Sequence, residues 1–311
     1  MPVHIRQLTP LALLERSADV FADRVAVVDG DRRQPGVGQA AEATRMANAL
    51  RASGIGPGDR VAYLAPNSIA MLVGHFAVPL AGGVLVAVNT RLAPLEVRSI
   101  LLHSGSRMLV ANASLAGTVL PVIDDLGVGE VVWDGEREGA ALPGTPYAEL
   151  RARGSDAPLP WTVGDEDATI SINYTSGTTG DPKGVMYTHR GAYLNALGEN
   201  ITHLHGPDTV YLWTLPMFHC NGWCHPWAIV GVGGRQVCLR AVRGDRIWQL
   251  IDTEGVTHLC GAPAVLSVLV NDPAAHPVDR PLTVTVAAAP PAPRPPSRPA
   301  TGTPCGVRTS R

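Results

Sequence analysis

The ten residues TSGTTGDPKG, from Thr175 to Gly184, gather groups that bind phosphate. Gly177, Gly180 and Gly184 allow positive φ and let backbone N–H groups approach an anion closely. Four neighbouring side chains add hydroxyl donors: Thr175, Ser176, Thr178 and Thr179. Lys183, the single lysine among 25 lysines and arginines, adds a movable ammonium suited to phosphate oxygens. The stretch predicts a phosphate-binding loop between a strand, ATISINY, and a helix that begins at about Thr188.

This loop differs from the P-loop pattern G-x-x-x-x-G-K-[ST]. Counting from Gly177, the second glycine would fall on Pro182, and Lys183 is followed by Gly184 instead of Ser or Thr. We therefore expect a polyphosphate held in another geometry. The alternative is a polar turn without a ligand, which the convergence of glycines, hydroxyls and one lysine disfavours.

A second reactive stretch is HCNGWCH, from His219 to His225, which offers two cysteines and two histidines. Zinc sites normally gather ligands from two separated pairs, and seven consecutive residues can scarcely wrap around one ion. We predict no metal site from this stretch. His219 stays a candidate for chemistry, with a core histidine at a strand end as the alternative.

The composition is that of an ordinary globular protein, with 311 residues, 45% of them hydrophobic and 17% charged. A net charge of -2 gives no electrostatic reason to expect nucleic acid or an anionic membrane as a partner. The five cysteines and a charged, amphipathic beginning indicate reduced thiols in a cytoplasmic protein. The oligomeric state is left open.

The elements that must position these residues alternate between strands and helices. Nearly all of the strands are apolar, which predicts an α/β fold with a parallel sheet covered on both faces. The long apolar run 69–88 is interrupted by Pro79 and by Gly82 and Gly83, and Asn67 and Ser68 precede it as a helix cap. We therefore expect a buried helix, a turn and a buried strand there, without a membrane span.

Three stretches depart from this alternation. Residues 134–160 are polar and rich in turn formers, so we expect a surface connection. RQPGVGQAA, residues 33–41, has Pro and Gly where a helix entry would favour apolar residues. The last 19 residues, 293–311, hold five prolines and four arginines, and we predict that this tail is disordered.

YTSGTTGDPKGVMYTHR closely resembles the signature loop of the adenylate-forming superfamily, which includes acyl-CoA synthetases, luciferases and adenylation domains of peptide synthetases. Five more stretches agree in order with an acyl-CoA synthetase: GDRVAYLAPNS, VNTRLAPLEVRSILLHSGSRMLV, LPMFHCNGW, GAPAVLSVL and VTVAAAPPAP. LPMFHCNGW is most similar to the branch that acts on short- and medium-chain acids. The resemblance implies that residues 1–292 form part of an AMP-binding N-terminal domain. Its two packed, mostly parallel sheets would have helices between and around them.

In this family a carboxylate attacks the α-phosphate of ATP, and coenzyme A then displaces AMP from the acyl adenylate. The resemblance implies that one loop holds the ATP phosphates, bridged by Mg²⁺: Thr175, Ser176, Gly177, Thr178, Thr179, Gly180, Lys183 and Gly184. His219 matches the histidine beside the acyl carboxylate. Lys183 and His219 are therefore the candidate catalytic residues.

The resemblance also implies an acid pocket and an adenine site. Trp223, Gly261, Ala262 and Pro263 match acyl-pocket positions, although such apolar residues would equally suit a core. Ala288, Ala289 and Pro290 match the small-residue turn that packs on adenine, and a Pro-rich strand exit would also explain them.

The similarity ends at about Ala292. Beyond that point relatives carry a Tyr-Gly-x-Thr-Glu segment, a hinge and a small C-terminal domain with a further lysine, none of which is visible in these 311 residues. We expect a truncated copy, from a frameshift or an early stop, with weak or no activity. RQPGVGQAA would be a smaller disturbance of the same kind.

Three functions stay open at this point. The first is an ATP-dependent acyl-CoA ligase, whose partners are a carboxylic acid, ATP and coenzyme A. The second is an adenylating enzyme that loads a carrier protein. The third is a non-catalytic nucleotide- or acyl-binding fragment or pseudogene product, which the missing lysine favours.

Overall fold

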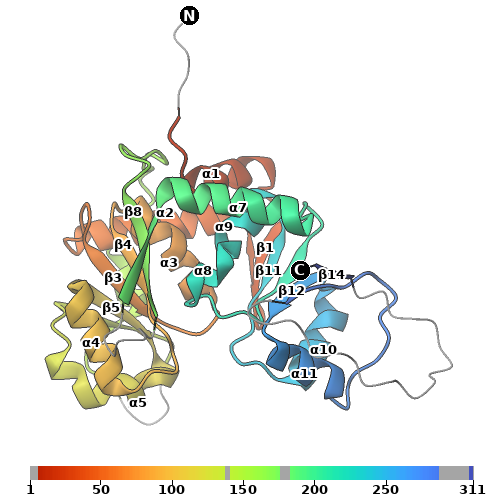
Figure 1. Cartoon of the computed structure of the whole chain (residues 1–311). Helices are drawn as coiled ribbons and strands as arrows, with labels where there is room; N and C mark the ends of the chain where they lie inside the picture. The colour runs from red at the N-terminus through yellow and green to blue at the C-terminus, as the bar shows by residue number, and fades with distance from the viewer. Residues whose placement is uncertain (1–5, 137–140, 176–182, 287–307, 311) are drawn as a thin grey trace, which may run out of the picture.

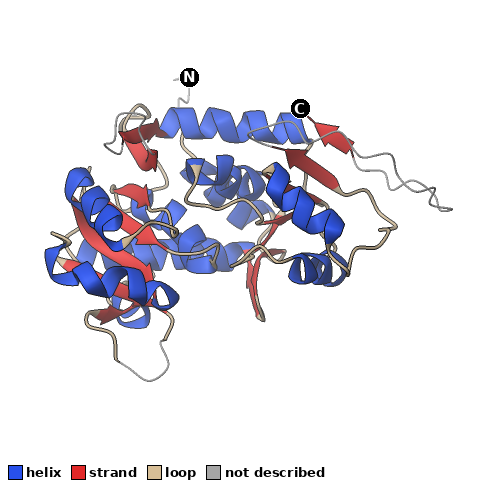
Figure 2. Ribbon diagram, turned by 60° about the horizontal axis from the view of Figure 1, so that its bottom comes forward, coloured by secondary structure: helices blue, strands red, loops and turns tan. Residues whose placement is uncertain are grey.

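The computed structural model of the chain describes residues 6–136, 141–175, 183–286 and 308–310. Within these ranges the chain forms two seven-stranded sheets, with helices between them and on their outer faces (Figure 1, Figure 2). All neighbouring strands run parallel except two hairpin pairs, β1 with β2 and β8 with β9. The α/β architecture of two packed, mostly parallel sheets is confirmed.

The first sheet has the strand order β14-β13-β12-β10-β11-β1-β2. Its strands are β14 (Arg308–Ser310), β13 (Thr283–Val286), β12 (His258–Gly261), β10 (Val210–Leu212), β11 (Arg235–Val237), β1 (Val25–Asp29) and β2 (Arg32–Pro35).

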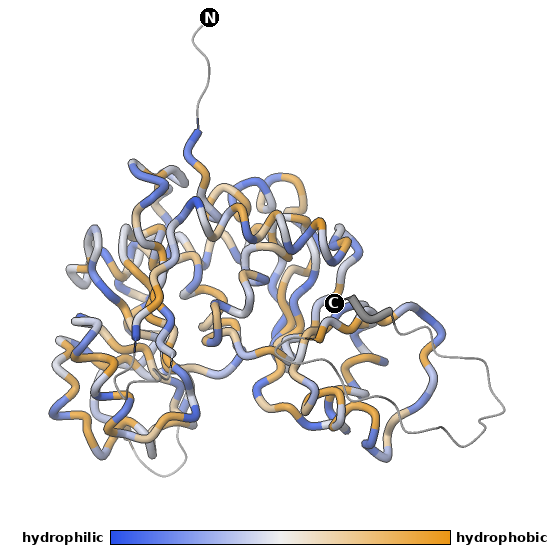
Figure 3. Tube along the Cα trace, in the orientation of Figure 1, coloured by the Kyte–Doolittle hydropathy of each residue, from blue (hydrophilic) through white to orange (hydrophobic). Residues whose placement is uncertain are grey.

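The second sheet has the strand order β7-β6-β5-β3-β4-β8-β9. Its strands are β7 (Thr145–Pro146), β6 (Glu130–Asp134), β5 (Ser106–Asn112), β3 (Arg60–Leu64), β4 (Val84–Ala87), β8 (Thr169–Thr175) and β9 (Lys183–Thr188). The residues 61–64 of β3, 84–87 of β4 and 108–111 of β5 are hydrophobic and buried, as the middle of parallel strands covered on both faces should be (Figure 3).

Helices cover the two sheets on both sides. Between the sheets lie α1 (Leu11–Val20), α2 (Gly36–Ala52), α3 (Ile69–Leu80), α7 (His189–His203), α8 (Cys220–Trp223) and α9 (His225–Gly231). The other helices are α4 (Pro94–Ser104), α5 (Ala116–Val119), α6 (Tyr147–Ala152), α10 (Gly244–Glu254) and α11 (Pro263–Asn271), with short 3₁₀ turns at Ala113–Leu115 and Leu120–Asp125.

Three apolar cores follow from this layering. The central core joins helices such as α3, through Phe76, and α9, through Trp227, to strands of both sheets. A second core lies between the first sheet and α10 and α11. The third lies between the second sheet and α4 and α5. The central helices therefore set the spacing of the two sheets.

The apolar run 69–88 folds as the sequence predicts. All twelve residues of α3 are buried, and Ser68 caps the helix by accepting a hydrogen bond from the backbone N–H of Met71. A turn at Gly82 leads into the buried strand β4. Among the described residues, no helix is both long enough and apolar enough to cross a bilayer.

The structure describes parts of the three stretches that depart from the alternation. Residues 33–35 belong to β2, whose pairing with β1 has a register shift, and residues 36–41 begin α2 after Pro35 in the extended N-cap conformation. The origin of this stretch in a disturbed reading frame stays a prediction. The surface connection 134–160 is confirmed, since most of its described residues are exposed, and it also contains the short elements β7 and α6. Within the tail expected to be disordered, Arg308–Ser310 pair with β13 as β14; the prediction stays open for residues 293–307 and 311, which lie outside the described ranges.

Asn67, expected to belong to the cap of α3, instead joins the two sheets. Its buried side chain donates to the backbone oxygens of Trp213 (2.8 Å) and Leu215 (3.0 Å). It also accepts from the N–H of Met217 at 2.8 Å. The Asn67 side-chain amide, which follows β3, thus fixes the position of residues 213–217, which follow β10.

Replacing Asn67 with Ala should lower the free energy of unfolding by about 3 kcal/mol, because two carbonyls and one N–H would stay buried without a partner. Asn48→Ala is the matched control, since the Asn48 side chain also donates to two carbonyls but at an exposed site. It should cost less than about 1 kcal/mol. Urea denaturation of both variants measures the difference, and equal losses would contradict a special role for Asn67.

A buried histidine in α3 predicts a pH-dependent stability. Burial lowers the pKa of His75 to about 4, below its unfolded value of about 6.5. The unfolded chain therefore binds more protons between these values, and stability is lost as the pH falls through that window. His75→Met should reduce the slope of unfolding free energy against pH by about 1 kcal/mol per unit near pH 5. Urea denaturation across this pH range measures the slope, and equal slopes in His75→Met and wild type would contradict the assignment to His75.

Candidate functional site

The ends of the predicted phosphate loop lie in a hairpin at the edge of the second sheet. Thr175 ends β8, Lys183 begins β9, and the two residues are paired across the antiparallel ladder. Gly184 pairs with Tyr174 in the same ladder. The remaining loop residues named above lie outside the described ranges: Ser176, Gly177, Thr178, Thr179 and Gly180.

The presence of β9 corrects the prediction that the loop leads directly into a helix. The chain passes from the loop into six residues of strand, and α7 begins only at His189. Lys183 and Gly184 are therefore strand residues, and the ammonium is carried by the sheet instead of by the loop. The hairpin still lies at the carboxyl end of the parallel strand β8, which is the edge where α/β proteins bind ligands.

The turn that carries His219 is tied to the same hairpin. Asn173, two residues before Thr175, donates from Nδ2 to the backbone oxygen of Phe218 at 2.7 Å. From the other side, the Asn67 amide fixes the chain as far as Met217. The structure therefore brings the residue before His219 to the end of β8.

Directly after His219 the backbone makes a left-handed turn. Five consecutive residues have positive φ: Cys220 (49°), Asn221 (50°), Gly222 (55°), Trp223 (57°) and Cys224 (63°). Left-handed geometry costs L-residues roughly 1–2 kcal/mol each and rarely extends beyond one residue. The hydrogen bond from Asn221 Nδ2 to Ser171 Oγ, at 2.7 Å, helps to hold the turn. Such strain persists only where surrounding contacts enforce it.

This turn presents His219 and Trp223 outward. His219 is exposed, and Trp223 is 49% exposed. The alternative of a core histidine is therefore wrong, and Trp223 is not a core residue either. Both side chains are available to a bound molecule at this edge.

Three of the residues predicted to line an acyl pocket lie at the end of β12, the strand beside β10, and at the start of α11. Gly261 ends β12, Ala262 is the N-cap of α11, and Pro263 is its first residue. Thr214 joins this segment to the exit of β10 by donating from Oγ1 to the carbonyl of Cys260 at 2.7 Å. Ala288, Ala289 and Pro290 follow β13 but lie outside the described residues.

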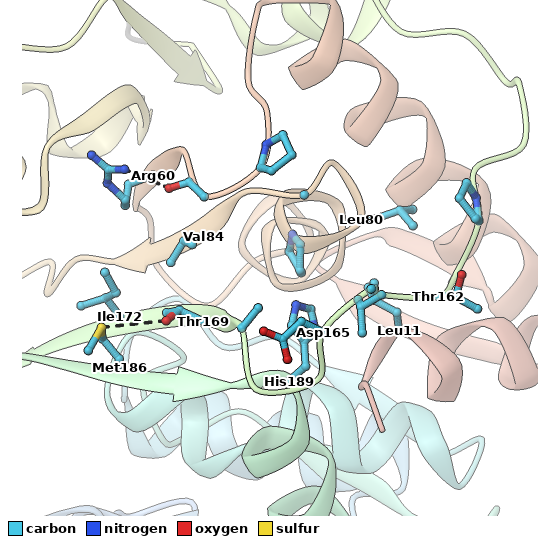
Figure 4. A pocket seen from close by; sticks show the side chains of 18 of the residues that line it. Leu11, Arg60, Leu80, Val84, Thr162, Asp165, Thr169, Ile172, Met186 and His189 are labelled. Carbon is cyan, nitrogen blue, oxygen red and sulfur yellow. Dashed lines mark hydrogen bonds between the residues drawn. The ribbon is translucent and has the colours of Figure 1, made fainter. Parts of the chain in front are cut away.

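Two hollows lie at the opposite edge of the second sheet. One, of 530 Å³, is lined by residues at the starts of three strands, Arg60, Val84 and Thr169 (Figure 4). The other, of 390 Å³, is lined by Ser106 and Glu130. Because both lie at the amino ends of parallel strands and contain none of the predicted site residues, they are separate from the candidate site.

Sequence reasoning missed the three asparagines that position this site. Asn67, Asn173 and Asn221 each use a side-chain amide to fix a loop backbone or a neighbouring strand. A polar residue inside an apolar run, such as Asn173 in ATISINY, was the available signal. A buried amide must find partners, so its presence in a strand predicts a contact with a nearby loop.

The candidate site lies at the carboxyl end of β8, at the edge of an α/β sheet where such proteins commonly bind ligands. The family model described as "AMP-binding enzyme" matches residues 14–305. The chain therefore belongs to the AMP-binding enzyme family.

Known proteins agree with this assignment. The chain is 38% identical over 290 residues to acetate/butyrate–CoA ligase AAE7 of Arabidopsis thaliana, covering 88% of this chain and 51% of that protein. It is 40% identical over 265 residues to 4-hydroxybutyrate–CoA ligase 2 of Metallosphaera sedula, covering 83% and 48%. The inhibitor-bound N-terminal domain of FACL13 from Mycobacterium tuberculosis aligns with a TM-score of 0.80 at 28% identity, covering 91% of this chain and 70% of that one. The chain spans about half the length of the curated relatives it matches.

The left-handed turn gives a direct test of how the site is built. A Cβ on Gly222 would lie 2.4 Å from Cζ3 of the buried Trp213. Gly222→Ala should therefore cost about 2–5 kcal/mol, from the positive φ and from overpacking together.

Gly255→Ala is the matched control for this substitution. Gly255 also has positive φ, but a Cβ there meets nothing within 4 Å. It should cost only about 1–2 kcal/mol. Thermal and urea unfolding measure both changes, and an equal cost at the two glycines would refute tight packing of the turn on Trp213.

Proposed function

We propose that this chain is the nucleotide- and acid-binding part of an ATP-dependent acyl-CoA ligase, an acid–thiol ligase. Such an enzyme activates a short- or medium-chain carboxylic acid as its acyl adenylate and transfers the acyl group to coenzyme A. The observation that carries the proposal is the bond from Asn173 to Phe218, which joins the Lys183–Thr175 hairpin to the His219 turn. The names of the relatives, which specify acetate, butyrate and 4-hydroxybutyrate, support a small acid.

The chemistry explains why an ammonium is needed at the hairpin. A carboxylate is a poor electrophile, and its attack on the α-phosphate of ATP releases pyrophosphate, which carries several negative charges. Preorganised donors around that developing charge are the main way to lower such a barrier. Lys183, at the start of β9, would supply a charge that follows the β- and γ-phosphates as they depart.

His219 would bind the other reactant. Its exposed imidazole, at the N-cap of the left-handed turn, can hydrogen-bond the acid carboxylate while the tail of the acid lies along Trp223 and the β12 exit. The role of His219 would be to orient the acid. Holding the carboxylate near the α-phosphate makes the attack effectively unimolecular, so the two reactants need not meet by diffusion. The strained turn would keep the imidazole fixed for that purpose.

Mg²⁺ would enter with ATP and would supply positive charge against the phosphates. The described residues at this edge offer a hydroxyl at Thr175, while the stretches 213–223 and 261–271 contain no carboxylate. These residues are not a magnesium ligand set, and we assign them no step through the metal.

The second candidate is a fragment that binds nucleotide or acid without catalysis. The observation that favours it is that Lys183 is the chain's only lysine, so that no second lysine in these 311 residues can assist adenylation. We also propose a cytoplasmic location, which the free thiols of Cys220, Cys224, Cys238 and Cys260 support.

Lys183→Ala should weaken ATP binding by about 10- to 100-fold, the worth of one charged hydrogen bond. Arg107→Ala is the control, because Arg107 is an exposed cation at the amino edge of the same sheet. Its loss should leave ATP affinity unchanged. Calorimetric titration of ATP into each folded variant decides the matter, and equal affinities in wild type and Lys183→Ala would contradict the assigned role.

Exchange of labelled pyrophosphate into ATP, tested with acids from acetate to laurate, distinguishes the two candidates. Robust acid-dependent exchange is the outcome expected of the ligase, with a maximum among the shorter acids, and it would rule out the inactive fragment. Thioester formation that depends on coenzyme A would then exclude a carrier protein as the acceptor. ATP binding without any exchange would establish the fragment instead.

A further inference from the structure

Four histidines gather behind the left-handed turn, where α7 packs on α9. They are His203, at the end of α7, His205, just beyond it, His225, at the start of α9, and His258, at the start of β12. Ring centroids are 5.9 Å apart between His203 and His225 and 5.0 Å apart between His205 and His258. None of the four belongs to the site described above.

A carboxylate completes this cluster. Glu199 and His203 are four residues apart on α7, so their side chains lie on the same helix face. One ligand atom each from Glu199, His203 and His225 can be chosen so that all three lie within 4.8 Å of one another. Glu199 and His225 are buried, at 8% and 1% exposure, and the His203 side chain is 8% exposed.

The hydrogen bonds of His225 fix which ring nitrogen is free. Its Nδ1 lies 3.0 Å from the backbone oxygen of Gly222, and because a carbonyl can only accept, Nδ1 carries the proton. Nε2 then carries no proton and presents a lone pair. Metal-binding histidines commonly donate their other N–H to a backbone carbonyl in this way, which fixes both the tautomer and the ring orientation.

His203 can adopt the same arrangement. Its Nδ1 lies 3.1 Å from the hydroxyl of Thr285 in β13, which can accept as well as donate a hydrogen bond. Its Nε2 lies 2.9 Å from Oε2 of Glu199. The tautomer in which Nδ1 donates to Thr285 presents a lone pair on Nε2 toward the carboxylate, and this is the tautomer that a bound cation would select.

Glu199 is the member of the cluster that most needs a partner. Although Oε2 lies close to His203 Nε2, no donor within the described residues reaches it with hydrogen-bond geometry. The hydroxyl of Tyr211, whose ring stacks on His225 at 4.6 Å, is also buried and has no hydrogen-bond partner in the described part of the chain. Buried charges in proteins are normally paired or coordinate a metal, because an isolated one is costly to desolvate.

We propose that Glu199, His203 and His225 form a binding site for a divalent transition-metal cation of the zinc class. Bonds of about 2.0–2.1 Å in a tetrahedron place ligand atoms roughly 3.3 Å apart, so the three atoms need only a small inward movement. Two imidazoles and one carboxylate with an open fourth position form a known zinc ligand set. Calcium and magnesium are disfavoured because they select oxygen ligands.

The site has a structural consequence for the turn beside it. The Gly222 carbonyl that orients His225 belongs to the left-handed turn that presents His219 and Trp223. A cation bound between α7 and α9 would therefore fix His225 and, through its hydrogen bond to Gly222, stabilise the turn. The proposal does not rest on the ligase function, since it concerns residues outside the nucleotide and acid site.

Zinc titration of the full chain, freed of metal with a chelator, tests the proposal. We expect one tightly bound Zn²⁺ per chain. We also expect a higher melting temperature with Zn²⁺ but not with Mg²⁺, since a ligand that binds only the folded state stabilises it. His225→Phe keeps the aromatic stack on Tyr211, and Glu199→Gln keeps the side-chain size. Each should weaken zinc binding by at least about 100-fold, more than loss of an outer-shell partner.

Two controls separate this site from adventitious binding. His276→Ala removes an exposed histidine that lies 3.0 Å from Asp252, and Cys220→Ser removes the half-exposed thiol next to His219. Neither should alter the tight zinc site. No tight zinc, or equal affinity in Glu199→Gln and wild type, would overturn the proposal. Loss of the tight site in Cys220→Ser would do the same, and if His225→Phe fails to fold, Glu199→Gln decides alone.

Discussion

The amide of Asn67 holds together the two parts of the molecule that the site needs. Its three hydrogen bonds reach across from the second sheet to the chain leaving the first, at Trp213, Leu215 and Met217. A single buried amide can satisfy this many groups because it offers both a donor and an acceptor end. The Asn67 amide thus positions the chain up to Met217, and the bond from Asn173 to Phe218 then ties the residue before His219 to β8 itself.

The strained turn after His219 is likewise held in place by contacts with its surroundings. Five left-handed residues are unfavourable in isolation, so packing on Trp213 and the bond from Asn221 to Ser171 must outweigh that cost. Because of this geometry, groups from one short stretch of backbone face two opposite sides. His219 and Trp223 point outward, while the Gly222 carbonyl faces back toward His225.

The sequence predicted the layered fold because its signals are local. Apolar runs, the interruption at Gly82 and the cap at Ser68 depend on neighbours along the chain. The strand β9 was missed because its residues, KGVMYT, form a strand only by pairing with β8 across the loop. Likewise, HCNGWCH was excluded as a metal site from its own seven residues, whereas His225 meets Glu199 and His203, which come from another helix. Tertiary partners of this kind cannot be inferred from one stretch of sequence.

The use of arginine almost everywhere and lysine at one place follows from what each group can do. Arg60 donates to the carbonyls of Gly58, Ser104 and Gly105, and Arg33 grips both oxygens of Glu254. A planar guanidinium fork suits such fixed partners, since one side chain satisfies several acceptors at set angles. Lys183, exposed at the start of β9, has a point charge on a flexible stem. Phosphate oxygens move apart as a bond breaks, so they do not stay at fixed angles. The flexible ammonium of a lysine can follow them, whereas the planar guanidinium of an arginine suits acceptors that stay in place.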